Sequence, residues 1–318
     1  MSNFQHFIEG LVSEKRTLGQ TYFRNESELH RFDAYCAKNY PEETVLTQEI
    51  VMNWALLRPD ESLGTLHRRA SAIRQLAKYM WRHGIEAYVL PDGFTGKRQR
   101  YNPHIYTKSE LSLLFHAMDY CKPCKQYPFY HFVVPVIYRL IYTCGLRPGE
   151  ALTLKAVDVN LQTGEILIRE AKGHKDRIVV LSFDMLELCR KYYFKMRLFY
   201  PHAEFFFPNY LGKAYSVPWI EKTFAKMWKR TGITTYENGP TPRIYDLRHT
   251  FATECLYRFV SEGKDLNAWL PYLSSYMGHL NYDSTAYYMH LVPAYFPIHS
   301  KGSEVFNKIV PEVRHEVY

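Results

Sequence analysis

Four short segments of the chain carry arginine, lysine, histidine and tyrosine side chains of the kinds that act on phosphate esters. The segments read TCGLRPGEALTL, AKGHKDR, RIYDLRHTFAT and YMGHLNYDSTAYYMHL, and they contribute Arg147, Lys172, Arg248, His279 and Tyr288. The planar fork of an arginine can hold two non-bridging phosphate oxygens at once. A pair of such forks stabilises the negative charge that develops when a nucleophile attacks phosphorus.

The remaining side chains supply the other parts of such a reaction. A tyrosine oxygen can attack phosphorus and form a covalent link, which conserves the bond energy for rejoining. A lysine in a hairpin turn can protonate the leaving sugar oxygen. This chemistry needs no metal or other cofactor, and the sequence has no Gly-rich phosphate loop and no HExxH, DxD or paired CxxC spacing. The lone Cys121 and Cys124 pair is expected to hold ordinary reduced thiols.

The order and spacing of these segments resemble the tyrosine recombinase (phage integrase) family, of the mobile-element integrase type. LRPGEALTL resembles the first arginine motif of that family, and YDLRHTFAT resembles its second box. GHLNYDSTAYYMHL resembles the segment in which the nucleophilic tyrosine follows a histidine by nine residues. Through these motifs the resemblance covers about residues 107–295, and the helical N-terminal part resembles the family's core-binding domain less specifically.

For the phosphate-binding residues, the resemblance implies that Arg147 and Arg248 clamp the scissile phosphate and that His279 hydrogen-bonds one of its oxygens. Glu150 is expected to buttress the neighbouring Arg147. Taken alone, an arginine after a helix end often only caps carbonyl groups, and a histidine after a glycine can simply end a helix. These alternatives weaken because a single reaction explains all of the residues together.

For the reacting groups, the resemblance implies Tyr288 as the nucleophile and Lys172 as the general acid, with Lys175 as the alternative acid. Tyr287 directly precedes the nucleophile, and neighbouring side chains of a helix point about 100° apart. One of the two tyrosines can therefore reach the phosphate while the other packs. The nine-residue spacing from the histidine favours Tyr288.

One position departs from the family pattern. The family usually has a histidine three residues before the second arginine, and this chain has Tyr245 there. A histidine can move a proton near neutral pH. A phenol, whose pKa is about 10, can donate a hydrogen bond but is a poor base. We therefore expect Tyr245 to position the phosphate and not to transfer a proton, while His249 and Asp246 support the site or cap the helix.

The positive charge of the N-terminal region is concentrated between residues 66 and 100, which hold eight Lys or Arg residues and two carboxylates. The segment GTLHRRASAIRQLAKYMWRHG predicts a helix with one apolar face, made by Leu66, Ala70, Ile73, Ala77 and Met80. Its polar face has no carboxylate, so we favour phosphate contact over an ordinary solvated face. The predicted DNA contacts are Arg68, Arg69, Arg74 and Lys78 on the helix, with Lys97, Arg98 and Arg100 in the following linker.

The expected fold is mainly α-helical with a small antiparallel β-sheet, an α+β catalytic core behind an N-terminal helical bundle. Residues 1–90 form the helical core-binding domain, 91–106 a basic linker, and 107–318 the catalytic domain with a C-terminal tail. Thr107 and Glu110 fit a capping box that begins the first catalytic helix. EILIREAKGHKDRIVVLS predicts a β-hairpin. The two domains are expected to close around DNA as a clamp.

Bulk composition agrees with a DNA-binding enzyme inside the cell. The 318 residues carry a formal net charge of +8, and 47% of them are hydrophobic. No apolar run reaches the roughly 18 residues of a membrane span, and the N-terminus lacks the apolar core of a signal peptide. We expect no membrane partner and a cytoplasmic protein, associated with the nucleoid when bound to DNA.

These observations predict a site-specific recombinase or integrase that uses a covalent 3′-phosphotyrosyl intermediate, integrates or excises a mobile element, and acts on double-stranded DNA. The resemblance implies a homotetramer on DNA, with a monomer or dimer when free. The amphipathic C-terminal tail, with Val305, Phe306, Ile309 and Val310, packs either on its own subunit or on a neighbour. Two alternatives stay open: a non-catalytic DNA-binding regulator of the same fold, and an enzyme like a type IB topoisomerase.

Overall fold

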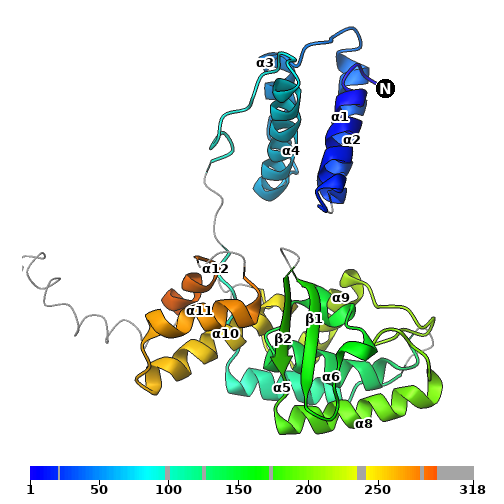
Figure 1. The fold of residues 1–318 in the computed structure, drawn as a ribbon, viewed down its shortest axis with the longest axis vertical. Coiled ribbons are helices and arrows are strands. Elements are labelled where there is room, and N and C mark those ends of the chain that lie inside the picture. Colours follow the sequence, from blue (N-terminus) through cyan, green and yellow to red (C-terminus); the bar gives the residue numbers. More distant parts are fainter. Residues whose placement is uncertain are drawn as a thin grey trace, which may run out of the picture. The chain divides into compact units, whose positions relative to one another are not determined.

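The chain folds into two units, Met1–Tyr101 and Asn102–Tyr318. The computed structural model describes residues 1–20, 22–96, 101–123, 127–171, 175–234, 241–279 and 283–291. Both units are mainly helical, and the described part of the second also contains a two-stranded antiparallel sheet (Figure 1). This confirms the predicted fold class. Among the helices that the structure describes, none has the length and apolar character that a membrane crossing requires.

The described part of the first unit contains four helices: α1 (Gln5–Thr17), α2 (Phe23–Asn39), α3 (Gln48–Trp54) and α4 (Leu63–Arg82). The hydroxyl groups of Thr47 and Ser62 each accept a hydrogen bond from the backbone N–H three residues later, and so cap α3 and α4. The five apolar residues predicted to share one face of α4 are all buried, and α4 packs on α1 and α2. The helical periodicity of this segment therefore identified the buried face correctly.

The prediction that Arg69 contacts DNA is wrong. Its side chain is buried, with 1% of the residue exposed, and it forms an ion pair with Glu61. The same guanidinium donates to the backbone carbonyls of Trp54 and Leu56 and lies over the Trp54 ring. Arg69 therefore fastens α4 to the chain that follows α3, and its nitrogens are already occupied inside the protein.

The second unit begins with α5 (Lys108–Asp119), which starts at the predicted capping box of Thr107 and Glu110. The elements that follow are α6 (Tyr130–Thr143), α7 (Pro148–Leu152), η1 (Ala156–Asp158), β1 (Glu165–Ala171), β2 (Lys175–Val180), α8 (Phe183–Phe199) and α9 (Val217–Arg230). Then come α10 (Ile244–Ser261), α11 (Leu266–Met277), α12 (Asp283–Ala286) and η2 (Tyr287–Leu291).

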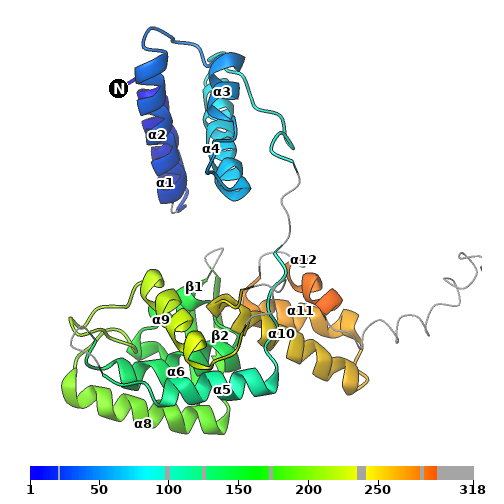
Figure 2. The same ribbon diagram turned by 180° about the vertical axis from the view of Figure 1, so that it is seen from behind.

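The strands β1 and β2 form the predicted hairpin, with Glu165 opposite Val180 and Ile166 opposite Val179. Side chains alternate along each strand, so Ile166 and Val179 are buried while Val180 is more than half exposed. Figures 1 and 2 show α5, α6 and α8 together on one side of this hairpin. The buried face of the sheet thus belongs to the same core as these helices.

Helix α10 joins two hydrophobic clusters of the second unit. Near its start, Ile244 and Leu247 belong to the large cluster that includes the sheet and α5 to α9. One turn later, Ala252 and Leu256 belong to a smaller cluster with α11 and Tyr288. Arg248 lies between these two groups on the same helix. The helix that carries this arginine is therefore fixed from both sides by apolar packing.

The role of Arg69 leads to a prediction about stability. Replacing Arg69 with alanine leaves the Glu61 carboxylate and two carbonyls without their partner, which costs about 3–5 kcal/mol for a buried ion pair. We expect Arg69→Ala to lower the protection of the peptides of residues 1–101 in hydrogen exchange of the full chain under urea.

Arg68→Ala is the matched control, because the Arg68 side chain is 41% exposed. We expect this variant to keep the protection of the unmodified chain. Equal protection in the two variants would contradict the structural role of Arg69.

Candidate active site

The C-terminal end of α11 receives three guanidinium groups on three consecutive carbonyl oxygens. Nε of Arg177 donates to Tyr276 (2.8 Å), Nη2 of Arg248 donates to Met277 (2.6 Å), and Nη2 of Arg147 donates to Gly278. The last carbonyls of a helix have no partner within the helix, and they form the negative end of its dipole. This helix end therefore gathers cationic side chains from α10, from β2 and from the residue that precedes α7.

Glu150 holds two of these arginines together. Its carboxylate accepts hydrogen bonds from Nη1 of Arg147 (2.7 Å) and from both terminal nitrogens of Arg177 (2.9 and 2.7 Å). It also accepts the backbone N–H of Arg147, which closes the first turn of α7. Burial by itself would raise the pKa of Glu150, but the hydrogen bonds and charges of Arg177 and Arg147 lower it to about 2. This carboxylate therefore stays ionised and balances part of the positive charge.

Arg248 is the most deeply buried of the three arginines, with 5% of the residue exposed. Its second terminal nitrogen, Nη1, donates to the carbonyl of Gly145 (2.6 Å). Gly145 has φ +61°, and a Cβ there would lie 2.5 Å from the Phe251 ring, so only glycine fits. Burial, together with the charge of Arg147, lowers the pKa of Arg248 to about 10. The guanidinium is therefore still protonated at neutral pH.

Tyr288 lies among these groups and is 3% exposed. Its ring stacks on that of His279, with the centroids 6.1 Å apart and the planes inclined by 18°. Its hydroxyl group hydrogen-bonds Nδ1 of His249, at 2.9 Å. Burial raises the pKa of Tyr288, and the charges of Arg248 and Arg147 act against that rise. The phenol is therefore protonated at neutral pH and must lose its proton before or during any attack.

Both histidines of the site are neutral at pH 7. Burial lowers the pKa of His279 to about 3 and that of His249 to about 4, and the charge of Arg248 adds to both shifts. Nδ1 of His279 hydrogen-bonds the hydroxyl of the fully buried Thr285, at 2.7 Å. The ring of His279 is thus held in place from η2 and α12, next to the end of α11.

Four of the predicted site residues come together around the end of α11. They are Arg147, Arg248, His279 and Tyr288, and the charges of the two arginines lower the pKa of His279 and oppose the rise in that of Tyr288. Tyr245 lies in the first turn of α10 and is 39% exposed. The predicted acid Lys172 lies outside the described residues. The alternative acid, Lys175, is the first residue of β2, and the structure does not describe its side chain.

The predicted DNA contacts of the first unit differ in exposure. Lys78 is exposed, and the Arg68 side chain is 41% exposed, 3.8 Å from the Glu28 carboxylate. Arg74 is only 17% exposed and donates to the carbonyls of Leu90 and Pro91, so it fastens α4 to the chain that follows. Lys97, Arg98 and Arg100 lie outside the described residues.

Sequence reasoning missed Arg177 and gave His249 only a supporting role. Arg177 shares the inward-facing side of β2 with the buried Val179, between the exposed Ile178 and Asp176. A cation on the buried face of a strand needs an ionised partner, and this alternation was the available signal. The contact of His249 with Tyr288 depends on how η2 packs on α10. No local sequence pattern predicts this packing.

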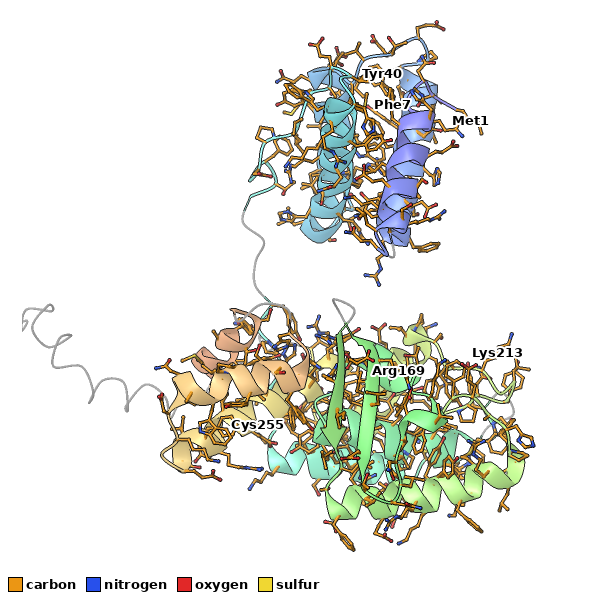
Figure 3. The ribbon with its side chains drawn as sticks, viewed as in Figure 1. Met1, Phe7, Tyr40, Arg169, Lys213 and Cys255 are labelled. Carbon is orange, nitrogen blue, oxygen red and sulfur yellow. The ribbon has the colours of Figure 1, made fainter. Side chains whose placement is uncertain are left out.

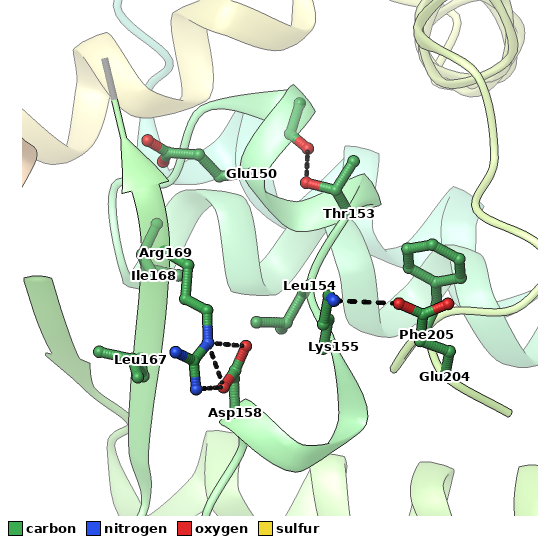
Figure 4. A pocket seen from close by; sticks show the side chains of 11 residues that line it. Glu150, Thr153, Leu154, Lys155, Asp158, Leu167, Ile168, Arg169, Glu204 and Phe205 are labelled. Atoms are coloured by element: carbon green, nitrogen blue, oxygen red, sulfur yellow. Dashed lines mark hydrogen bonds and ion pairs between the residues drawn. The ribbon is translucent and has the colours of Figure 1, made fainter. Parts of the chain in front are cut away.

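A pocket beside the site has its charges paired internally. It lies between α7, β1 and residues 204–205, as Figure 4 shows. There Arg169, which Figure 3 also labels, pairs with Asp158 at 2.7 Å, and Lys155 pairs with Glu204 at 3.0 Å. The carboxylate of Glu150, at the edge of the pocket, is bound to Arg147 and Arg177. The pocket therefore meets the cluster around Tyr288 at Glu150, and its other charged residues pair with one another.

Known proteins resemble the chain over most of its length. It is 28% identical to the putative integrase/recombinase y4rB of Sinorhizobium fredii over 300 residues, 91% of this chain and 93% of the relative. It is 24% identical to the tyrosine recombinase XerC of Staphylococcus saprophyticus over 295 residues, 90% of this chain and 92% of the relative.

Solved structures of DNA-bound recombinases share the fold. XerH site-specific recombinase bound to palindromic difH substrate, in a post-cleavage complex, matches with a TM-score of 0.66 and 21% identity, over 87% of this chain and 78% of that chain. The Tn1549 transposon integrase in complex with a circular intermediate DNA matches with a TM-score of 0.63 and 16% identity, over 91% of this chain and 95% of that chain.

The model of the phage integrase family matches residues 105–294, which is more than half of the chain and includes every residue of the cluster around α11. The chain therefore belongs to the phage integrase family and is a tyrosine recombinase.

Proposed function

We propose that this enzyme cleaves and rejoins double-stranded DNA through a covalent 3′-phosphotyrosyl intermediate and recombines specific sites. The observation that carries the proposal is the buried phenol of Tyr288 beside two arginines. A phosphodiester carries one negative charge and gains more in its pentacoordinate transition state. Arg147 and Arg248 stabilise that charge, and the phenol oxygen next to them attacks the phosphorus.

The bond changes of strand cleavage balance without a metal or nucleotide. The Oη–P bond forms as the P–O5′ bond breaks, and the 5′ oxygen takes a proton from Lys172, the proposed general acid. The proton of Tyr288 passes in the same step from the phenol to a base beside it. Rejoining runs the sequence in reverse, with a 5′-hydroxyl attacking the phosphotyrosine and Tyr288 as the leaving group.

The proposed DNA contacts of the first unit are the exposed cations of α4, Arg68 and Lys78. The net charge of +8 supports contact with a polyanion. Exchange between two duplexes requires four strands to be cut, and each active site contains one Tyr288. We therefore propose that four copies of the chain act together on DNA.

We also propose that the recombined sites belong to a mobile element, which the enzyme integrates or excises. This role is supported by the likeness to y4rB, named as an integrase/recombinase, and to the transposon integrase structure with circular intermediate DNA. The chain also resembles XerC, which is named as a tyrosine recombinase and not as an integrase. An experiment must therefore identify the DNA sites on which this enzyme acts. DNA sequencing of the junctions formed in cells that carry the gene and its flanking DNA would identify the recombined sites.

The proposed function leads first to a prediction about the nucleophile. On a nicked suicide substrate we expect the unmodified chain to form a covalent protein–DNA adduct and Tyr288→Phe to form none, because the phenylalanine ring packs equally well but lacks the attacking oxygen. Denaturing gel electrophoresis of labelled DNA measures the adduct. Tyr287→Phe is the matched control and keeps the adduct.

Adduct formation by Tyr288→Phe would exclude this residue as the nucleophile. Absence of any adduct with the unmodified chain on its own flanking DNA would favour a non-catalytic DNA-binding regulator. Joining of strands from two different duplexes supports a recombinase, whereas relaxation of supercoils by single copies without such joining would indicate a topoisomerase.

The second prediction concerns Tyr245, which we propose positions the phosphate through its hydroxyl group. A hydrogen bond to a charged group contributes about 1.5–3 kcal/mol, so Tyr245→Phe should slow adduct formation by roughly 10- to 100-fold. Tyr245→His restores a donor and should be tolerated. A Tyr245→Phe variant that cleaves at the unmodified rate contradicts this role.

The third prediction concerns Arg177, which holds Glu150 and through it Arg147. Arg177→Met leaves a buried carboxylate with one partner fewer, which costs about 3–5 kcal/mol of stability. We expect a lower thermal midpoint and, well below that midpoint, slower adduct formation because Arg147 is less firmly oriented. Lys191→Met, an exposed change on α8, is the control and should alter neither quantity.

A further inference from the structure

His249 hydrogen-bonds the proposed nucleophile, Tyr288, and none of the sequence motifs explains this contact. Its Nδ1 atom lies 2.9 Å from Oη of Tyr288, and the two ring centroids are 5.4 Å apart. His249 directly follows Arg248 on α10, so the helix that anchors the arginine also fixes this imidazole. The geometry is that of a hydrogen bond between a phenol and a ring nitrogen.

The phenol needs a proton acceptor, and the other side chains at hand are poorly suited. Burial raises the pKa of Tyr288, so solvent does not remove its proton readily at neutral pH. Tyr245 is itself a phenol and a weak base. His279 has Nδ1 bound to the Thr285 hydroxyl, and its ring stacks on the face of Tyr288.

His249 is in the protonation state that an acceptor requires. Burial and the charges of Arg248 and Arg243 lower its pKa to about 4, so the ring is neutral at pH 7. A neutral imidazole has one nitrogen with a free lone pair. With its proton on Nε2, His249 accepts the hydrogen bond of Tyr288 at Nδ1. A phosphate bound by the arginines offsets part of their charge and so increases the proton affinity of this ring.

We propose that His249 is the catalytic proton acceptor for Tyr288 during strand cleavage and returns the proton during rejoining. The proposal rests on the proposed function, in which Tyr288 attacks the phosphate. As the Oη–P bond forms, the phenol proton passes to Nδ1 of His249, and the P–O5′ bond breaks with a proton from the general acid to O5′. In rejoining, the same proton moves from His249 back to Oη as the phosphotyrosyl bond breaks.

Two variants separate proton transfer from hydrogen bonding alone. His249→Asn places an amide near the position of Nδ1, which can hydrogen-bond the phenol but has no basicity, and His249→Ala removes both abilities. The rate of adduct formation is measured in a single turnover on the suicide substrate at pH 7, with DNA binding and the thermal midpoint measured in parallel. General base catalysis contributes about 10²–10⁴-fold, so we expect both variants to lose at least 100-fold while they bind DNA.

The dependence of the cleavage rate on pH distinguishes a proton acceptor from a structural residue. Replacing a residue with a purely structural role would leave this dependence unchanged. The groups that face His249 are Arg243 and Arg248 on its own helix, His279 and Tyr288. Because the pKa of His249 is lowered to about 4, its acceptor form is fully present above pH 5 and is lost as pH falls through 4. Bound phosphate raises this pKa in the DNA complex, so we expect the rate of the unmodified chain to reach a plateau by pH 8. In the variants hydroxide must take the proton, so the rate should keep rising, by about tenfold per pH unit.

A sulfur-containing substrate separates the base from the acid. When sulfur replaces the bridging O5′, the leaving thiolate needs no proton, so cleavage by Lys172→Ala should recover while cleavage by the His249 variants should stay slow. His202→Asn, at an exposed histidine after α8, is the matched control and should cleave like the unmodified chain.

The proposal is overturned if His249→Asn cleaves at the unmodified rate at pH 7, if its rate also reaches a plateau by pH 8, or if the sulfur substrate restores its cleavage. Failure of the proposed function looks different, because the unmodified chain would then form no adduct with either substrate.

Discussion

The arrangement of this active site depends on one end of one helix. Three consecutive carbonyls at the C-terminus of α11 bind Arg177, Arg248 and Arg147, which come from parts of the chain far apart in sequence. Three guanidinium groups repel one another, and the partial negative charge of the helix end together with the Glu150 carboxylate makes their approach favourable. The same contacts fix α10, β2 and the start of α7 against one another, so the fold and the charge of the site have a common origin.

Burial, with the positive charge of the arginines as the second cause, sets the protonation of the histidines and the tyrosine of the site. Burial lowers the pKa of both His249 and His279, the charge of Arg248 adds to the effect, and both rings are neutral at pH 7. The buried phenol of Tyr288 keeps its proton because burial outweighs the attraction of the arginines. The result is a set of neutral partners around cations, which favours binding of an anion and leaves the nucleophile protonated until that anion arrives.

The sequence was sufficient for features that depend on local spacing, and insufficient for those that depend on packing between distant segments. The hairpin, the capping box at Thr107 and the buried face of α4 all follow from short-range patterns. Arg69 has the same sequence context as Arg68, but its guanidinium turns inward to Glu61 and the carbonyls after α3. The helical periodicity indicates which residues lie at the edge of the apolar face of α4. Which of their long side chains is buried depends on contacts with the segment that follows α3.

The histidine beside the second arginine illustrates the same limit within the active site. The nine-residue spacing identified Tyr288, but the partner of its hydroxyl is set by how η2 lies against α10. If His249 accepts the proton, the enzyme still has a base although position 245 is a tyrosine. Tyr245 then binds the phosphate, and a different residue, His249, accepts the proton of Tyr288. An imidazole whose proton affinity is lowered by arginines becomes a better base when phosphate offsets their charge. Activation of Tyr288 is then coupled to the presence of its substrate.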